Sequence, residues 1–345
     1  MRYISLATPK NTAGLLSSLL LFSALLLVAH RPASAEQVLL VSNLGGNTVG
    51  EYNADTGATI DSTFINTSQG LSGPAEMALD GNNHLFVANI NNNTVGEYKA
   101  TTGATINPTF INGQGLSSPA GLAFDRNNHL LVANYQATTP GVYTVGQYDA
   151  TTGVTVNANF ISPPGAFPDA LAIDTANRIF VGTAQYDSVA AYDATTGAQG
   201  LFFHTGGASG GTVGGIVVDA LNHVLVADTY HNVVHECDAT TGAIINATFI
   251  SDSQGLNGPY GLTLDGNNHL FVVNNGNNTV GEYDATTGAT INATFISGSQ
   301  GLNVPLGIVL VNTVPEPSTL VLAAFGFAGL AAWGCRRNTV RVAIA

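Results

Sequence analysis

The feature that most constrains this chain is an internal repeat. In each copy an apolar run ends in an aspartate, and these aspartates recur at intervals of 45 to 49 residues along the 345-residue sequence. They are Asp80, Asp125, Asp174, Asp219 and Asp265, and Val311 takes the place in the last copy. A period of about 40–50 residues with four strand-like segments in each unit is typical of a β-propeller blade. The repeat therefore predicts an all-β chain built from equivalent four-stranded sheets.

The four strands can be placed within a unit. In the second copy, the second to fourth strands fall at residues 84–89, 94–98 and 109–111. The first and second strands are apolar at nearly every position, which indicates burial on both faces of the sheet. Between them, Asp80-Gly81 and Asp265-Gly266 predict a turn with the glycine at positive φ, and Gly153 predicts the same for a turn between the third and fourth strands.

The phase of the repeat predicts how the ring closes. The repeats begin with a second strand at residues 38–43 and end with a first strand at residues 306–311. The N-terminal strands therefore need the C-terminal strand to complete their sheet, and this pairing removes the exposed edges of a linear array. We predict a six-bladed β-propeller over residues 36–312. The uniform unit argues against the competing architecture, a two-sheet sandwich.

Charge and cysteine content exclude some classes of function. The chain has 9 Lys+Arg against 22 Asp+Glu, a net charge of −13, and only Lys99, Arg126 and Arg178 are basic within the repeats. An acidic body of this kind repels phosphate backbones, so we expect no nucleic-acid partner. The two cysteines, Cys237 and Cys335, cannot form a disulfide framework.

The N-terminal segment, residues 1–35, predicts export. Basic Arg2 and Lys10 precede an apolar run at residues 15–28, and Ala33-Ser34-Ala35 follows it. This order is typical of a signal peptide that signal peptidase removes, which places the start of the mature chain near Glu36. The alternative is a buried N-terminal helix.

The C-terminal segment, residues 313–345, has three parts. A Pro-Glu-Pro motif precedes an apolar stretch, and residues 318–335 would form a helix of about 27 Å, the short end of a membrane span. Paired arginines follow and would stay cytoplasmic. The motif and basic residues are Pro315, Glu316, Pro317, Arg336 and Arg337. The alternative to a processed signal is a plain C-terminal membrane anchor.

This tripartite order resembles the PEP-CTERM sorting signal. The resemblance implies transient anchoring in the membrane by the C-terminal helix, processing by an exosortase, and release to the cell surface or extracellular matrix of an exopolysaccharide-producing, Gram-negative bacterium. The tail after Arg337 is longer and more apolar than such signals usually show.

The repeats themselves resemble the NHL family of propellers. The segment from Pro119 to Asp125 (PAGLAFD), followed by the segment from His129 to Asn134 (HLLVAN), carries the likeness, which recurs from about residue 38 to residue 311. In most copies Asn replaces the family's usual Asp at the end of the second strand. The resemblance implies that the loops after the second strand and before the first strand open onto the ligand face.

Polar residues at the ends of the second strands are candidate ligand contacts. They are Asn43, Asn89, Asn134, Asp228 and Asn274. Their side-chain oxygens could coordinate a ligand or cation, and the alternative interpretation is a cap on each adjacent turn.

Departures from the repeat add further candidates. A longer loop in the third copy brings Tyr135 and Tyr143, and the fifth copy places Tyr230, His231 and His235 near Asp228. Together they predict an aromatic, histidine-bearing pocket on one side of the ligand face. The alternative is drift in a tolerant loop.

Four histidines recur at the start of the second strand, on the face opposite the ligand face: His84, His129, His223 and His269. Because zinc ligands must converge on one ion and these lie on separate blades, we expect these histidines not to bind a metal. The predicted set of metals and cofactors is empty, and a divalent cation is the alternative.

No phosphate-binding loop or HExxH pair is present in the sequence. We therefore expect an exported surface or matrix protein whose non-catalytic propeller binds polysaccharide, protein or a cell surface. The alternative is an extracellular lyase or lactonase that uses a divalent cation held near Asp228 and His231. A third interpretation makes the propeller a spacer in a surface array.

Overall fold

The computed structural model describes residues 36–313 except 140–141, 164–166, 185–186 and 206–210. The predicted signal peptide and the predicted C-terminal helix lie outside these residues. Residues Gln37–Val311 form one compact unit. Within the described part of the chain, no helix is long and apolar enough to cross a membrane.

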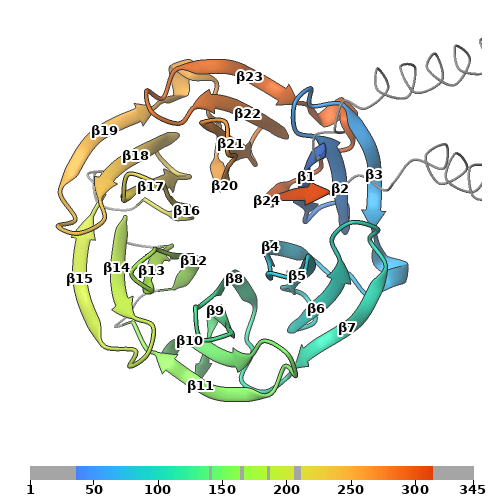
Figure 1. Ribbon diagram of the computed structural model, residues 1–345, viewed down its shortest axis with the longest axis vertical. Coiled ribbons are helices and arrows are strands. Elements are labelled where there is room, and N and C mark those ends of the chain that lie inside the picture. Colours follow the sequence, from blue (N-terminus) through green and yellow to red (C-terminus); the bar gives the residue numbers. More distant parts are fainter. Residues whose placement is uncertain (1–35, 140–141, 164–166, 185–186, 206–210, 314–345) are drawn as a thin grey trace, which may run out of the picture. The chain divides into compact units, whose positions relative to one another are not determined.

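Six antiparallel sheets of four strands surround a common axis, so the fold is the predicted six-bladed propeller (Figure 1). We number the blades in chain order and call their strands a to d from the axis outward. Blade 1 contains β24 (Pro305–Thr313), β1 (Glu36–Asn43), β2 (Thr48–Asn53) and β3 (Thr59–Ile65). Blade 2 contains β4 (Pro74–Leu79), β5 (His84–Asn89), β6 (Thr94–Lys99) and β7 (Thr105–Asn112). Blade 3 contains β8 (Pro119–Phe124), β9 (His129–Thr139), β10 (Val142–Asp149) and β11 (Thr155–Ile161).

The second half of the ring repeats this plan. Blade 4 contains β12 (Pro168–Ile173), β13 (Arg178–Thr183), β14 (Ser188–Asp193) and β15 (Gln199–His204). Blade 5 contains β16 (Val213–Val218), β17 (His223–Asp228), β18 (Val233–Asp238) and β19 (Ile244–Ile250). Blade 6 contains β20 (Pro259–Leu264), β21 (His269–Asn274), β22 (Thr279–Asp284) and β23 (Thr290–Ile296). Short 3₁₀ helices lie in three d–a connections: η1 (Thr67–Gln69), η2 (Asp252–Gln254) and η3 (Gly298–Gln300).

The ring closes as the phase of the repeat predicts. The last strand, β24, lies beside β1 in the sheet of blade 1. The loops beside this junction are also tied together: Leu44 N–H donates to the Val304 carbonyl at 3.0 Å, and Asn303 N–H donates to Oδ1 of Asn43 at 3.0 Å. Closure gives blade 1 its full four strands, so β1 is not left as an exposed edge.

The turn between strands a and b differs from the prediction. Gly81 and Gly266 are not among the residues at positive φ; Asn83 (φ 60°) and Asn268 (φ 71°) take that conformation. The reason is that Asp80 Oδ1 accepts the backbone N–H groups of Asn82 and His84, both at 2.8 Å, which makes a longer turn with its left-handed residue at the fourth position. Asparagine tolerates this conformation. At the c–d turn the prediction is confirmed, with Gly153 at φ 70°.

Adjacent blades are joined by apolar clusters and by a recurring tyrosine. Tyr98 on β6 is fully buried, and its hydroxyl donates to the Gln69 carbonyl in the connection that enters blade 2, at 3.2 Å. The glycine two residues before it, Gly96, is required because a Cβ there would lie 2.7 Å from the tyrosine hydroxyl. The same Gly-x-Tyr arrangement and hydrogen bond occur at Tyr52, Tyr148 and Tyr283.

Candidate functional site

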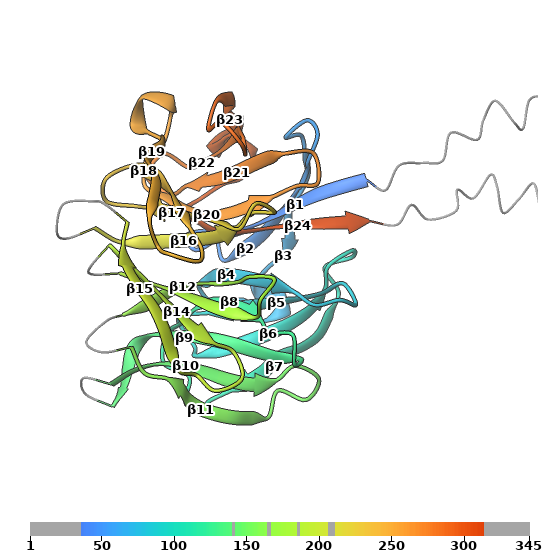
Figure 2. The same ribbon diagram turned by 60° about the vertical axis from the view of Figure 1, so that its left-hand side comes forward.

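The propeller has two faces that differ in their loops (Figure 2). The b–c and d–a connections lie on one, which we call the loop face, and the a–b and c–d turns lie on the other, the turn face. Val38, near the start of β1, pairs with Asn53, where the c–d turn begins, so the chain enters the ring at the turn face. β24 runs antiparallel to β1 from the loop face and also ends at the turn face. Both chain ends of the propeller therefore leave from the face opposite the predicted ligand face.

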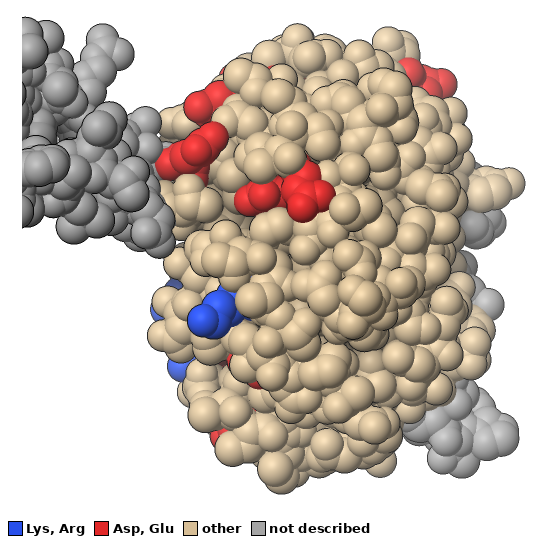
Figure 3. All heavy atoms as spheres, turned by 90° about the vertical axis from the view of Figure 1, so that its right-hand side faces the viewer, with Lys and Arg blue, Asp and Glu red and all other residues tan. Residues whose placement is uncertain are grey.

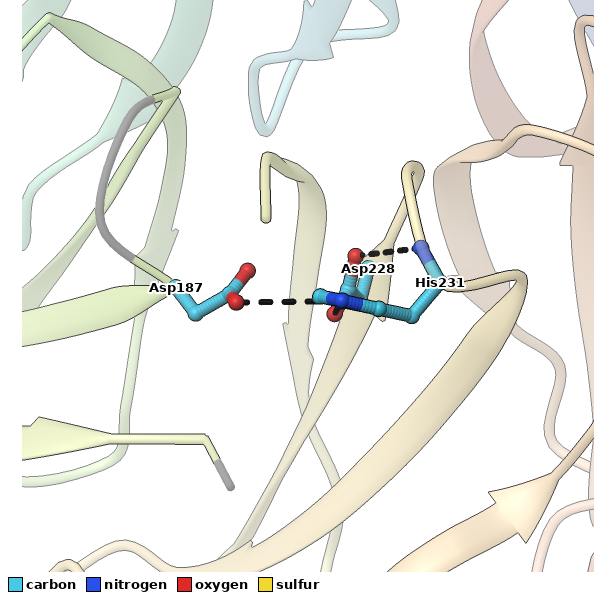
Figure 4. Close-up of side chains that lie close together, drawn as sticks. All are labelled: Asp187, Asp228 and His231. Carbon is cyan, nitrogen blue, oxygen red and sulfur yellow. Dashed lines mark hydrogen bonds and ion pairs between the residues drawn. The ribbon is translucent and has the colours of Figure 1, made fainter. Parts of the chain in front are cut away.

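On the loop face, blades 4 and 5 bring together two carboxylates and an imidazole (Figure 4). Nδ1 of His231 lies 2.6 Å from Oδ2 of Asp228 and 3.7 Å from Oδ2 of Asp187. One ligand atom from each of the three side chains lies within 4.8 Å of the other two. We call this group the loop-face cluster.

Local hydrogen bonds hold each member of the cluster in place. Asp228 ends β17, and its Oδ1 accepts the backbone N–H groups of Tyr230 at 3.1 Å and His231 at 2.9 Å, which folds the loop so that the imidazole returns to Oδ2. Asp187 has a left-handed backbone (φ 45°), and its Oδ2 accepts the Gly211 N–H at 2.9 Å. A Cβ at Gly211 would collide with the Asp187 carboxylate, so only glycine fits there.

A fourth side chain reaches the cluster because blade 5 departs from the Gly-x-Tyr arrangement. His235 stands where the other blades have glycine or alanine, and Cys237 stands where they have tyrosine. The smaller cysteine leaves room for the imidazole. His235 Nδ1 lies 2.6 Å from the Ala247 carbonyl, which orients the ring so that Nε2 lies 3.5 Å from Oδ2 of Asp228.

The charges of the cluster are coupled. Burial first, and then the charge of Asp228, raise the pKa of Asp187. Burial also opposes ionisation of Asp228, but polar contacts with His235 and His231 outweigh it and lower its pKa. The hydrogen bond to Asp228 raises the pKa of His231. Oδ1 of Asp187 is buried and has no hydrogen-bond partner among the described residues.

An imidazole and two carboxylates are a donor set suited to a divalent cation such as Zn²⁺ or Mn²⁺. The orphaned Asp187 oxygen and the approach of two carboxylates to one imidazole fit such an ion. Tyr230 is 71% exposed and packs edge-on against the His231 ring, with centroids 5.1 Å apart. The structure thus brings together three of the predicted site residues, Asp228, Tyr230 and His231, with His235, which the sequence also placed near Asp228, and adds Asp187, which the sequence analysis missed.

The four predicted asparagines, by contrast, are fully buried. The Oδ1 atom of each accepts a backbone N–H from the d–a connection that enters its own blade; for Asn89 the donor is Ser72 at 3.0 Å, and for Asn134 it is Ser117 at 2.9 Å. Asn43 and Asn274 make the same contact. Since these oxygens already have partners, we place the candidate site on the remaining residues.

The two tyrosines of the longer loop in blade 3 form an aromatic group of their own. Tyr143 and Tyr135 pack on Phe167, with ring centroids 4.3 and 5.7 Å from it. Tyr135 is 40% exposed. Burial, and after it the charge of Asp169, raise the pKa of Tyr135. Asp169 lies on β12, the innermost strand of blade 4.

At the axis lies a group that the sequence analysis missed. Glu76, Asp169 and Tyr260 come from the innermost strands β4, β12 and β20, and the Tyr260 hydroxyl donates to Oδ2 of Asp169 at 2.6 Å. Burial, aided by the charge of Asp169, raises the pKa of Glu76 to about 8; burial raises that of Asp169 to about 7 although the tyrosine opposes it. Glu76 also lines an axial cavity of about 30 Å³, enough for a water molecule. The sequence did carry a signal for Glu76, because the other five blades have glycine or alanine at its position.

Comparison with known proteins supports both the predicted sorting signal and the predicted fold. Residues 313–337 match the PEP-CTERM protein-sorting motif. The match confirms the predicted sorting signal, which implies an exported protein processed by an exosortase. No curated protein matches the sequence.

Solved structures resemble the ring at low identity. One chain of a nidogen/laminin complex aligns with a TM-score of 0.59 and 16% identity, covering 80% of this chain and 99% of that chain. A protein of unknown function from Bacteroides caccae gives 0.58 and 14%, with the same coverage. XC5397 from Xanthomonas campestris, a gluconolactonase, gives 0.53 and 15%, covering 69% and 83%. At these identities the likeness establishes the propeller fold alone.

Proposed function

We propose that this is a surface or extracellular-matrix protein whose loop face binds polysaccharide with the help of a divalent cation. Removal of residues 1–35 by signal peptidase and exosortase processing within residues 313–345 leave the propeller of residues 36–312 as the mature protein. The predicted membrane helix serves as a transient anchor before release.

One observation carries this proposal: an exposed tyrosine sits on a cation-competent cluster, on the face turned away from both chain ends of the ring. Tyr230 offers an apolar ring face with a polar edge, as sugar rings require, and it lies beside His231 of the loop-face cluster. A cation held by Asp187, Asp228 and His231 would bind sugar hydroxyl or carboxylate oxygens. Both chain ends of the ring, the start of β1 and the end of β24, lie on the turn face, opposite this surface.

The test uses residues 36–313, which contain the complete ring, on a glycan array and in calorimetric titrations with bacterial exopolysaccharide. We expect binding that a chelator weakens and that Tyr230→Ala weakens at least about tenfold, because the variant removes the aromatic contact. Leu221→Ala is the matched control, since Leu221 is 65% exposed on the turn face of the same blade. Binding that survives both the chelator and Tyr230→Ala would refute the proposal.

The cluster also favours a second candidate, an extracellular lyase or lactonase. The His231–Asp228 pair, at 2.6 Å, has the geometry of a general base and its orienting carboxylate. If this candidate is correct, the protein turns over a lactone or a uronic-acid glycan, and His231→Ala abolishes turnover while the fold remains. Binding without turnover over a broad substrate panel favours the non-catalytic role.

A further inference from the structure

A second kind of cluster recurs on the turn face. In blades 2, 5 and 6 the histidine that begins strand b lies between an aspartate from strand a and a glutamate from strand c. His84 Nδ1 lies 3.4 Å from Asp80 Oδ2 and 3.0 Å from Glu97 Oε1. The corresponding distances are 3.3 and 2.9 Å around His223, and 2.9 and 3.5 Å around His269. The histidines do lie on separate blades, but each has its own pair of carboxylates.

The glutamates of these clusters are buried: Glu97 is 9% exposed, Glu236 8% and Glu282 7%. A buried carboxylate beside a second carboxylate is unfavourable unless a cation balances it. The propeller has little positive charge to offer, since Lys99, Arg126 and Arg178 are its only basic residues. Charged side chains of either sign are sparse on the side of the molecule drawn in Figure 3.

Blade 4 contains a permanent cation at the equivalent place. Arg178 replaces the histidine, and its Nη2 and Nε lie 2.6 and 2.7 Å from Oδ2 of Asp174. Ala191 of this blade stands where blades 2, 5 and 6 have glutamate. The repeat thus accepts a positive group at this position.

Blade 3 has a neutral side chain in place of the glutamate. Gln147 replaces the glutamate, and His129 Nδ1 lies 2.8 Å from Asp125 Oδ2 and 3.1 Å from Gln147 Nε2, within hydrogen-bonding geometry. In blade 5, by contrast, Nδ1 of His223 is buried and has no well-directed hydrogen bond to any described residue, although Glu236 is 2.9 Å away. Blades 2, 5 and 6 therefore combine an extra buried carboxylate with a histidine in place of a permanent cation.

We propose that these three clusters each bind one divalent transition-metal ion of the Zn²⁺ class: Asp80–His84–Glu97, Asp219–His223–Glu236 and Asp265–His269–Glu282. Of the three clusters, only that of blade 5 has all three ligand atoms within 4.8 Å of one another, close enough for small movements to bring them to the metal–ligand distances of about 2.0–2.2 Å. The ligand atoms of blades 2 and 6 are further apart and must move more to reach one ion. The mixed imidazole and carboxylate set favours Zn²⁺ over Mg²⁺ and Ca²⁺, which prefer oxygen alone.

The charge of the residue that pairs with each histidine ranks the three sites by their expected affinity for a cation. Lys99 pairs in register with His84 in blade 2, whereas Asp238 and Asp284 pair with His223 and His269. A nearby ammonium opposes a second cation and a nearby carboxylate favours it. The sites of blades 5 and 6 are therefore tighter than that of blade 2.

The test is a calorimetric Zn²⁺ titration of residues 36–313 carrying Asp228→Asn, which disables the loop-face cluster. We expect three bound ions, and Glu97→Gln, Glu236→Gln and Glu282→Gln each weaken one site at least about tenfold. These substitutions copy the arrangement of blade 3, which the fold tolerates, and circular dichroism verifies folding. The matched gain variant is Gln147→Glu, which creates a fourth site.

Two results would overturn the proposal: Zn²⁺ affinities that the three Glu→Gln substitutions leave unchanged, or no uptake of Zn²⁺ by the folded Asp228→Asn protein. Neither result bears on the loop-face cluster, because Asp187, Asp228 and His231 lie on the other face and are assayed separately in the parent protein.

Discussion

Blades 2 and 6 are nearly identical in sequence, whereas blades 4 and 5 depart from the repeat, and the two pairs differ in what they contribute. In blades 2 and 6 the hydroxyls of Tyr98 and Tyr283 each donate to the connection that enters the blade. In blade 4 the Tyr192 hydroxyl is buried without a partner among the described residues, and in blade 5 Cys237 replaces the tyrosine.

The comparison teaches that the same departures that remove inter-blade hydrogen bonds bring together the side chains of the loop-face cluster. Replacing Gly-x-Tyr by His235-x-Cys237 removes an inter-blade hydrogen bond and places an imidazole beside Asp228. The regular blades stabilise the ring, and blades 4 and 5 give up part of that stability where the site is built, as expected where local rules are broken for function.

The strongest way to break this comparison is Cys237→Tyr. In the regular blades a Cβ two residues before the tyrosine would lie within 2.6–2.7 Å of its ring atoms, so the larger His235 side chain would collide with the new ring. We expect destabilisation by about 1–3 kcal/mol in urea unfolding. Adding His235→Gly restores the arrangement of the other blades, and the double variant regains stability. Equal destabilisation in single and double variants would contradict the packing argument.

Asp228→Asn separates the site from the fold. Four other blades have asparagine at this position, so the variant should fold normally. It removes a carboxylate that faces both His231 and His235, and we expect cation affinity at the loop face to fall at least about tenfold. Affinity in the parent should rise as pH increases, because protons compete for His231, whose pKa lies above its ordinary value of about 6.5. Titrations at pH 6 and pH 8 check both statements; affinity independent of pH would argue against His231 as a ligand.

Glu76→Gln tests a departure inside the otherwise regular blade 2. Burial raises the pKa of Glu76 from 4.5 to about 8. Between these values the folded protein holds a proton that the unfolded chain has released, so this group makes stability fall as pH rises. We expect the variant to be more stable than the parent by about 1–2 kcal/mol above pH 8 and nearly equal near pH 5. Urea unfolding at both pH values gives the answer, and parallel pH profiles for the two proteins would exclude the buried carboxyl as the cause.

The smallest expected change in stability comes from substitutions of two tyrosines. Tyr98→Phe removes a buried hydrogen bond and should cost about 1 kcal/mol of stability. Tyr192→Phe removes a buried hydroxyl with no partner and should be neutral or slightly stabilising. Thermal unfolding of the pair measures the difference; a similar loss at both positions would mean that blade 4 has a partner for Tyr192 in solution.

Much of the ring could be predicted from the sequence because its information is local and repeated. Apolar runs placed strands a and b, and the phase of the copies placed β24 beside β1. The a–b turn was predicted incorrectly because Asp-Gly suggested a tight turn, whereas the aspartate side chain organises a longer one that ends in Asn83. Asp228, Tyr230 and His231 were predicted because they interrupt the repeat close together in the chain.

Asp187 and the axial group required the tertiary structure. Asp187 lies 41 residues before Asp228 in the chain, and only the packing of blade 4 on blade 5 brings their carboxylates to one imidazole. Glu97 follows His84 by 13 residues, and strand pairing places them together. Periodicity and turn residues act over a few positions, so the sequence by itself determines the blades, their number and the C-terminal sorting signal. Which charged side chains meet depends on how rigid sheets pack around an axis, and that was decided by the tertiary structure alone.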